Sequence, residues 1–333
     1  MPFLMKRASR IEPDLQVARG VGVESALAAS WDRYVPGDAI RSATQRRPPA
    51  IAGQQICASD ECAGGWQMPW KNRRRPIFEG QWGCNAKCLA VIIRRSLRRE
   101  GGNLSVQMQA PGPHRHRIPL GLVMLSQGWI TQAQLRRALD AQRSSGEGRI
   151  GEWLVRESST SPAQVTRALA IQWSCPVLPI DGFTPSAMAL TMPRVFVEEL
   201  GLLPLRVAGS RILYLAFNDR LDASASFALE RMSALRVESG LVEEKQFDAA
   251  RSRLLESSFA DVTNGFAADT DALGTKIAAI LEQMQPVGAR IVRLHQRYWL
   301  RIWLENGAYS GVGDLPATGE DVRDMIFTLD HGI

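Results

Sequence analysis

The feature that most restricts the fold of this chain is a repeat with an offset of 30 residues between positions 118 and 173. At this offset several residues coincide: Leu120-Gly121 with Ile150-Gly151, Leu135 with Val165, Leu139 with Leu169, and Gln142 with Gln172. Each copy also carries the capping-box pattern of a hydroxyl residue followed three positions later by glutamine, in Thr131–Gln134 and Ser161–Gln164. So many matches at one offset indicate a duplicated helix–turn–helix unit.

The second helix of each unit presents two aliphatic side chains and one amide on a single face, at positions i, i+4 and i+7. Such a face is typical of core packing between stacked helical hairpins. It would also suit a ligand with two similar halves. A glycine near the start of each first helix would let that ligand approach backbone N–H groups. Arg149 adds a guanidinium that can pair with a phosphate or with the edge of guanine.

The segment Arg149–Gln172 resembles the 24-residue motif of the MshEN domain, the N-terminal domain of type II secretion and type IV pilus assembly ATPases of the GspE and PilB types. The stretch from Leu202 to Asp219 is similar to the second subdomain of that family, so the resemblance covers roughly residues 118–256. It implies an α+β fold, with a helical tandem-repeat subdomain at 118–175 followed by a small α/β sandwich subdomain at 176–256. It also implies that the two motifs together bind cyclic di-GMP, each holding one half.

Carried over residue by residue, the resemblance implies ligand contacts in both copies: Leu120, Gly121, Leu135, Leu139 and Gln142 in the first, and Arg149, Ile150, Gly151, Leu154, Val165, Leu169 and Gln172 in the second. The second copy departs from the motif at Ser158, where the family has glycine, and at Thr160, where it has an aliphatic residue. The first copy has Pro119 where the family has arginine. Loss of that charge-assisted contact would cost about 1.5–3 kcal/mol, unless Arg115 or Arg117 replaces it.

The ATPase half of the family architecture is not expected, because no G-x-x-x-x-G-K-[ST] motif occurs in the chain. No Ser/His/Asp or Cys/His set stands out, and a catalytic role is not predicted for His114, His116, His295 or His331. We therefore expect a non-enzymatic cyclic di-GMP-binding regulatory or adaptor protein, with a secretion or pilus assembly protein as partner. The alternatives are a ligand-free structural adaptor with a degenerate site and a zinc-dependent nucleic-acid-binding regulator.

Four of the five cysteines lie within 32 residues, as the pair Cys57 and Cys62, with four residues between them, and the pair Cys84 and Cys88, with three. Short cysteine pairs of this kind present two thiolates each to one tetrahedral Zn²⁺. Residues 56–102 are therefore predicted to form a zinc-ribbon-like module with four cysteine ligands; the alternative is free thiols. Cys175 is expected to be a small core residue.

The basic charge is concentrated in the N-terminal third: residues 1–119 hold 19 Lys and Arg against 9 Asp and Glu, and the remainder holds 21 against 25. Between the cysteine pairs lie aromatic and basic residues: Trp66, Trp70, Arg73, Arg74, Arg75, Phe78 and Trp82. They could bind nucleic acid by stacking and charge, or pack over the zinc site and meet an acidic protein.

Other expectations concern the flanking segments. Residues 1–55 are expected to be disordered or weakly ordered, and a helix over 87–100 should end at Gly101-Gly102. Residues 176–256 alternate predicted strands and helices. A linker at 257–270 should precede a small α+β unit at 271–330, with a helix, a hairpin and a last helix over 319–329. No run of about 18 apolar residues and no signal-peptide pattern occurs, so we expect a cytoplasmic protein without membrane insertion.

Overall fold

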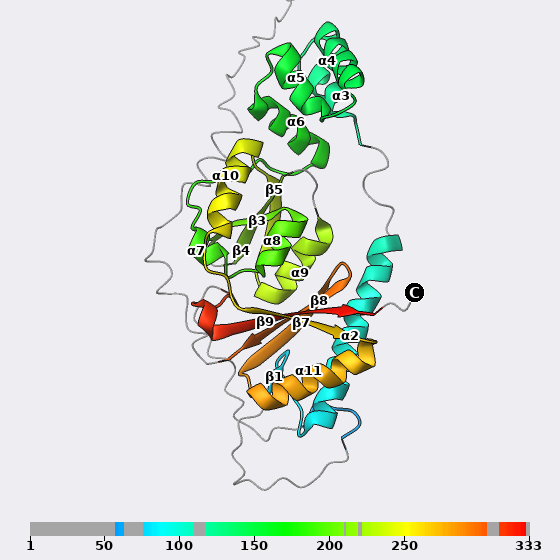
Figure 1. Cartoon of the computed structure of the whole chain (residues 1–333), viewed down its shortest axis with the longest axis vertical. Helices are drawn as coiled ribbons and strands as arrows, with labels where there is room; N and C mark the ends of the chain where they lie inside the picture. The colour runs from blue at the N-terminus through cyan, green and yellow to red at the C-terminus, as the bar shows by residue number, and fades with distance from the viewer. Residues whose placement is uncertain are drawn as a thin grey trace, which may run out of the picture. The chain divides into compact units, whose positions relative to one another are not determined.

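The computed structural model describes residues 57–62, 76–109, 117–209, 211–218, 222–304 and 313–330 (Figure 1). Several expectations fall outside these ranges: the N-terminal segment 1–55, the basic and aromatic residues Trp66, Trp70 and Arg73–Arg75, and the histidines His114, His116 and His331.

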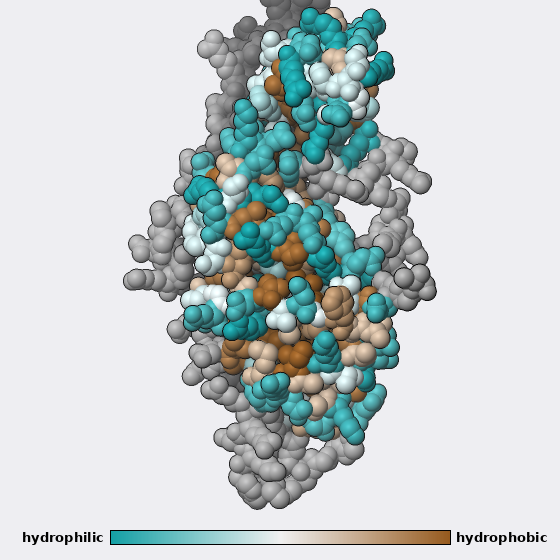
Figure 2. Space-filling model, viewed as in Figure 1, coloured by the Kyte–Doolittle hydropathy of each residue, from teal (hydrophilic) through white to brown (hydrophobic). Residues whose placement is uncertain are grey.

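The helical repeat consists of four helices: α3 (Leu120–Ser126), α4 (Gln132–Ser145), α5 (Ile150–Ser158) and α6 (Pro162–Trp173). Both predicted capping boxes are confirmed. Thr131 and Gln134 cap α4 reciprocally, and Ser161 and Gln164 cap α6 in the same way. The repeat has its own apolar core, which includes Met124, Ala138, Leu154 and Ala168. On the face shown in Figure 2, α4 and α5 present mainly polar residues to solvent.

The α/β part begins with two short helices, α7 (Pro185–Met188) and α8 (Arg194–Leu200). Its sheet has the order β3-β4-β5, formed by Leu202–Ala208, Ile212–Phe217 and Arg236–Leu241. Strands β3 and β4 are antiparallel, whereas β4 and β5 are parallel and are joined through α9 (Ala223–Ser233). Helix α10 (Glu244–Leu255) completes this part. Before α7, the chain pairs with this sheet through a single bridge between Val177 and Leu241.

A second sheet follows, with the order β6-β9-β8-β7. Its elements are β6 (Val262–Ala267), α11 (Thr270–Met284), β7 (Gly288–Leu294), β8 (Arg297–Trp303), a 3-10 turn (Gly319–Asp321) and β9 (Val322–Leu329). The predicted helix and hairpin are confirmed, but two expectations are wrong. The segment expected to be a linker contains strand β6, and the segment expected to be the last helix forms mainly strand β9. Both segments gain ladder hydrogen bonds from distant strands, β9 from two neighbours, and this pairing outweighs local preference.

The cysteine-containing segment supplies a short hairpin and a long helix: β1 (Ile77–Phe78), β2 (Gln81–Trp82) and α2 (Ala86–Gln109). The expected end at Gly101-Gly102 is wrong, because the helix continues through both glycines. Glycine costs only about 1 kcal/mol relative to alanine inside a helix. The apolar face of α2 packs against α11 and the second sheet in one core that includes Leu89, Ile93, Ile277 and Leu300.

A buried ion pair within the second sheet also contacts the α/β part. Arg301 of β8 and Asp324 of β9 are 1% and 0% exposed, and the guanidinium binds both carboxylate oxygens at 2.8 and 2.7 Å. Arg301 also donates to the carbonyls of Leu190 and Thr191, while Trp299 donates its indole N–H to Asp324. Each nitrogen of the guanidinium and each carboxylate oxygen thus has a hydrogen-bond partner. Among the described helices, none is long and apolar enough to cross a membrane.

Candidate functional site

The two halves of the repeat are tied to each other by equivalent hydrogen bonds. Gln142 of the first unit donates its Nε2 to the carbonyl of Gly148 at 2.9 Å, and Gln172 of the second donates to the carbonyl of Ile118 at 2.8 Å. The donors of the two bonds are 30 positions apart, and so are the acceptors. Gln142 therefore holds the residue directly before Arg149 in the second unit, and Gln172 holds the residue directly before Pro119 in the first.

The equivalent glycines have the same packing role in both units. A Cβ on Gly121 would lie 2.6 Å from Cδ1 of Leu135, and one on Gly151 would lie 2.8 Å from Cγ1 of Val165. Each glycine thus lets the first helix of its unit contact the aliphatic face of the second. The position that a Cβ would take at each glycine is thus filled by an aliphatic side chain of the same unit.

The residues implied as ligand contacts differ in their exposure. Leu154 is fully buried and Leu120 is 8% exposed, so both serve the core of the repeat. Four of the remaining aliphatic residues lie half-buried at the edge of that core, where one side can meet solvent or a ligand: Leu135, Ile150, Val165 and Leu169. Leu139 is half-buried as well. Arg149 is exposed and occupies the N-cap position of α5. The structure thus places an exposed cation at the start of the second unit.

Pro119 occupies the corresponding N-cap position of α3 and makes no side-chain capping bond. Arg117, two residues earlier, has its guanidinium over the ring of Trp173, directly after Gln172. Arg115 lies outside the described residues. The first unit therefore has the proline ring of Pro119 at the N-cap position where the second has the guanidinium of Arg149.

The second unit departs from the motif because its first helix is longer. In the first unit Gly128 has φ +69° and ends the turn after α3, whereas in the second unit Ser158 is still helical and Ser159 takes the left-handed conformation at φ +55°. Ser158 and Thr160 are buried, and their hydroxyls are hydrogen-bonded to each other at 2.8 Å. The two hydroxyls therefore satisfy each other inside the core. The second unit can thus hold Ser158 and Thr160 where the motif has glycine and an aliphatic residue.

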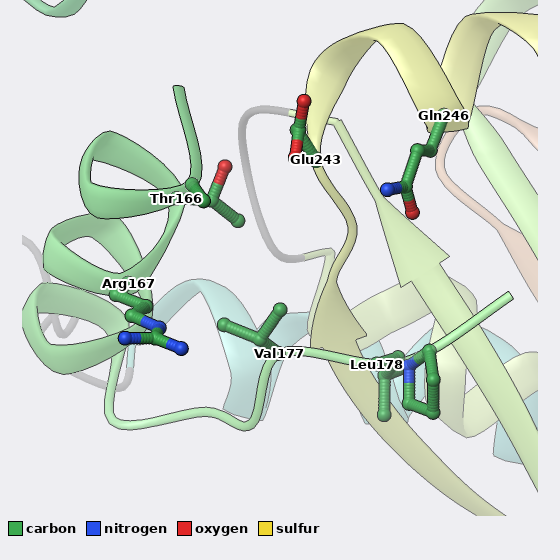
Figure 3. Close-up of a pocket in the computed structure, with 8 residues that line it drawn as sticks. Thr166, Arg167, Val177, Leu178, Glu243 and Gln246 are labelled. Atoms are coloured by element: carbon green, nitrogen blue, oxygen red, sulfur yellow. The ribbon is translucent and has the colours of Figure 1, made fainter. Parts of the chain in front are cut away.

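A separate pocket of about 240 Å³ lies between α6, the segment 177–179 and the start of α10 (Figure 3). Thr166 and Arg167 line it from α6, with Glu243 and Gln246 on the opposite side. None of the implied ligand contacts lines this pocket, so it is distinct from the two motif faces.

The four clustered cysteines meet at one point, with all four sulfur atoms within 4.8 Å of one another. The Sγ of Cys84 lies 3.4 Å from that of Cys88 and 3.7 Å from that of Cys62. A tetrahedral Zn²⁺ with Zn–S bonds of about 2.3 Å requires sulfur–sulfur distances of about 3.8 Å. The predicted ligands Cys57, Cys62, Cys84 and Cys88 are therefore brought together at a spacing that fits one such ion.

Local turns explain this arrangement. The amide of Ala58 donates to the carbonyl of Trp82 at 2.9 Å and places the first cysteine pair beside the hairpin. The side-chain oxygen of Asn85 accepts from the amide of Cys88 at 2.9 Å, so that Cys84 lies just before α2 and Cys88 lies in its first turn.

The surroundings shift the pKa of three of the clustered thiols, in different directions. Burial raises the pKa of the Cys84 and Cys88 thiols. Burial also acts to raise the pKa of Cys57, but hydrogen bonds from the backbone of Ser59 and Cys84 outweigh it and lower that pKa below its usual value. The backbone amide of Cys84 points at the Cys57 sulfur at 3.4 Å, as expected for a group that stabilises a thiolate.

Two of the aromatic residues considered for base stacking lie within the described residues, and both are buried. Phe78 is 0% exposed and belongs to the core under α2, and Trp82 is 5% exposed. Cys175, outside the cluster, is half-buried, and burial raises its pKa. Sequence reasoning missed the ion pair of Glu100 in α2 with Arg231 in α9, because the two residues are far apart in the chain.

The helical repeat, the three-stranded α/β part and the cysteine cluster define a mixed α+β protein. Residues 173–260, which include the three-stranded α/β part, match the model of the MshEN domain. This match confirms the expected resemblance for that segment. No curated protein matches the chain. Among solved structures, one described as MshE with cdg is similar at 29% identity and a TM-score of 0.34, covering 41% of this chain and 99% of that chain. An N-terminal domain of XpsE is 18% identical, with 40% and 92% covered and a TM-score of 0.28.

Proposed function

We propose that the helical repeat binds cyclic di-GMP and that the chain is a non-enzymatic regulatory or adaptor protein of a type II secretion or type IV pilus system. The observation that carries this proposal is the pair of equivalent bonds from Gln142 to Gly148 and from Gln172 to Ile118. They give the repeat two similarly built half-sites, which suits a ligand made of two identical halves. The match of residues 173–260 to the MshEN domain, directly after the repeat, supports the same ligand.

Each half-site offers an aliphatic face next to the start of a helix. Leu135 and Leu139 line the first face, and Val165 and Leu169 line the second; all four are half-buried. Such faces can contact the planes of two guanine bases. Arg149 supplies a charged, planar donor for a phosphate or for the O6/N7 edge of a guanine.

The two half-sites differ in charge, because Pro119 has no side-chain donor. A missing charge-assisted contact is worth about 1.5–3 kcal/mol, or roughly ten- to hundredfold in affinity. We therefore propose a site that binds more weakly than one with an arginine in both units. Pro119→Arg should raise the affinity for cyclic di-GMP.

Calorimetric titration of the full chain with cyclic di-GMP tests the proposal. We expect a stoichiometry set by the two half-sites together, and a roughly tenfold or greater loss of affinity in Arg149→Ala. Arg136→Ala, an exposed arginine of α4, is the matched control and should bind as the parent does. Absence of heat from folded protein would refute cyclic di-GMP binding and leave the ligand-free structural adaptor, which Pro119 and the filled space beside Gly121 and Gly151 favour.

The cysteine cluster supports a second proposal, that Cys57, Cys62, Cys84 and Cys88 bind one structural Zn²⁺. The support is the mutual approach of four thiols within 4.8 Å. Metal analysis should find about one zinc per chain, and Cys175→Ser should retain it. Nucleic-acid binding is the less supported role for this segment, because Phe78 and Trp82 are buried.

A further inference from the structure

We infer that the four-cysteine site fixes one end of a cover, and that loss of its metal opens the cover from that end while the other end stays attached. The cover consists of residues 77–109, that is β1, β2 and α2. It closes one face and one edge of the sheet β6-β9-β8-β7. The inference rests on the proposed zinc site. It goes beyond that site because it states that metal loss opens one segment of the protein locally and does not unfold the whole chain.

The cover hides an apolar face of the sheet. Leu89, Ile93 and Leu97 of α2 are 1%, 0% and 0% exposed. They share one core with Ile277 of α11 and with Leu300 of β8. The two sides of this core are separated by more than 150 positions in the sequence, so non-covalent contacts alone hold the cover on the sheet.

The cover also protects an edge. The amide of Glu79 donates to the carbonyl of Ala289 at 2.7 Å, and that of Ile77 donates to the carbonyl of Pro286 at 3.4 Å. Strand β1 thus lies along β7, the last strand of the sheet on that side. An uncovered edge strand presents unpaired backbone groups to other chains, so the hairpin has a protective role there.

Besides its core contacts and the two edge hydrogen bonds, the cysteine end of the cover depends on the cluster. Strands β1 and β2 contain two residues each, and a hairpin of this size is not stable alone in water. The four sulfur atoms come together from three segments: the loop with Cys57 and Cys62, Cys84 after β2, and Cys88 in the first turn of α2. Because a metal bound here adds its binding free energy to folding, its removal should free these pieces first.

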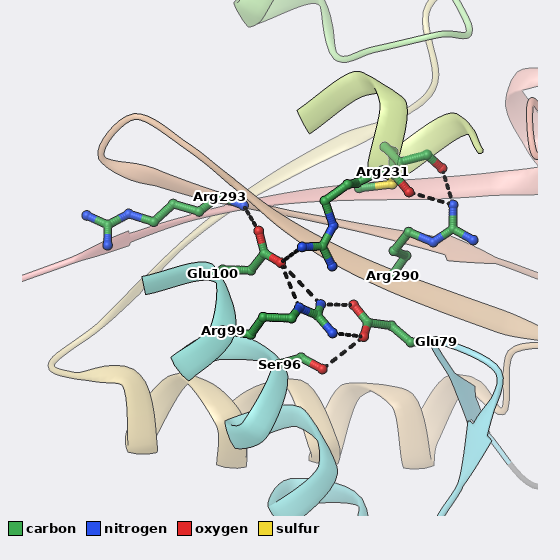
Figure 4. Close-up of polar contacts among 8 residues, drawn as sticks. Glu79, Ser96, Arg99, Glu100, Arg231, Arg290 and Arg293 are labelled. Carbon is green, nitrogen blue, oxygen red and sulfur yellow. Dashed lines mark hydrogen bonds and ion pairs between the residues drawn. The ribbon is translucent and has the colours of Figure 1, made fainter. Parts of the chain in front are cut away.

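The other end of the cover is fixed independently of the cysteines (Figure 4). Glu100 of α2 is 3% exposed and accepts from Arg231 of α9 at 2.8 Å and from the backbone amide of Arg293 in β7 at 3.3 Å. Arg99 also donates to Glu100 and joins it to Glu79, 2.8 Å away. These charge-assisted bonds attach the later turns of α2 to both the α/β part and the sheet, and they involve no cysteine.

Hydrogen–deuterium exchange of the full chain, before and after zinc is removed with a chelator, tests this inference. We expect exchange to rise about tenfold or more in residues 77–93 and at 286–291 of the β7 edge. A smaller rise is expected around Glu100. The helical repeat at 120–173, with its own core, should exchange at the same rate in both states.

Variants give an independent measurement. Cys62→Ser should reproduce the pattern without chelator, whereas Cys175→Ser should exchange as the parent does and still respond to chelation. Glu100→Gln, with zinc present, should raise exchange at the later turns of α2 and leave residues 77–93 protected.

Two results would overturn the inference, and they are distinguishable. If zinc is bound and then removed without a change at 77–93, or if the whole chain loses protection together, the local opening is refuted and the zinc site stands. If the purified protein contains no zinc and added Co²⁺ gives no thiolate absorption, the zinc proposal fails and the inference with it. Neither result bears on cyclic di-GMP, which is titrated separately.

Discussion

Gln172 of α6 donates its side-chain amide to the carbonyl of Ile118, 54 positions earlier in the chain, at 2.8 Å. This bond joins the last helix of the repeat to the residue just before its first motif. The equivalent bond from Gln142 to Gly148 joins the two units in the middle. A residue that resembles a ligand contact in sequence therefore also has a structural role.

Replacing these glutamines should loosen the repeat. Gln172→Leu removes a side chain–backbone hydrogen bond, so we expect the free energy of unfolding to fall by about 0.5–1.5 kcal/mol. Chemical denaturation measures this. Gln132→Leu, at an exposed position in the first turn of α4, is the control and should change stability little. Equal effects of the two substitutions would argue against a specific role for the Gln172 bond.

The two motif glycines should respond differently to alanine. In Gly151→Ala the new Cβ meets Val165, whose branched side chain has few alternative rotamers, and we expect a loss of about 1–3 kcal/mol from overpacking. In Gly121→Ala it meets the end of Leu135, which is half-exposed and can rotate away. The gain in helix propensity then offsets most of the cost. Thermal unfolding of both variants would contradict this if Gly121→Ala were the more damaging.

The buried pair in the second sheet gives the largest expected effect. Asp324→Ala leaves the Arg301 guanidinium buried without its carboxylate, and should lower the free energy of unfolding by about 3–5 kcal/mol. Asp271→Ala removes an exposed partner of Arg94 and should cost less than about 1 kcal/mol. The double variant Arg301→Met with Asp324→Leu should recover much of the loss in a denaturant titration. If the double variant is as unstable as Asp324→Ala, the loss has another cause.

A pH dependence is expected from His295 at the turn between β7 and β8. Its ring lies 2.7 Å from the carboxylate of Asp222, and this hydrogen bond raises the pKa of His295 above 6.5 although burial opposes it. The resulting stabilisation is fully present below pH 6.5 and is lost as the pH rises through the raised pKa. Because the ring is about half exposed, the effect should be well under 1 kcal/mol.

Asp222 sets the acidic limit of the same contact. Burial acts to raise its pKa, but the bond from His295 and the amides of Ala225 and Ser224 lower it below 3.8. This contribution is present above pH 3.8 and is lost as the pH falls through the lowered pKa. The difference in melting temperature between the parent and His295→Asn, which tolerates the positive φ at this turn, should therefore be largest between about pH 4 and 6.5. A difference that does not vary from about pH 5 to 9 would contradict the assignment.

Local patterns in the sequence predict the elements whose determinants are local. The capping boxes of the repeat follow from two residue pairs, Thr131 with Gln134 and Ser161 with Gln164. Strands β6 and β9 could not be predicted in the same way, since each depends on partners that only the fold supplies. Their local composition suits a linker and a short helix equally well.

The candidate sites divide along the same line. The spacing of Cys57, Cys62, Cys84 and Cys88 is enough to predict that the four thiols meet. For the repeat, sequence identifies which residues are equivalent but not what each contacts. The contact of Gly121 with Leu135 and the bond from Gln172 to Ile118 depend on how two helices approach, and no residue type specifies that distance.

The packing of α2 against α11 has a consequence for synthesis of the protein. Leu97 is translated 176 positions before Leu273, the partner helix residue in the same core. At about 5–20 residues per second, this interval is on the order of 10–35 s. During that time the apolar stripe of α2 is outside the ribosome without the surface that will bury it. The apolar stripe of α2 therefore stays without its partner surface until the C-terminal strands have been translated.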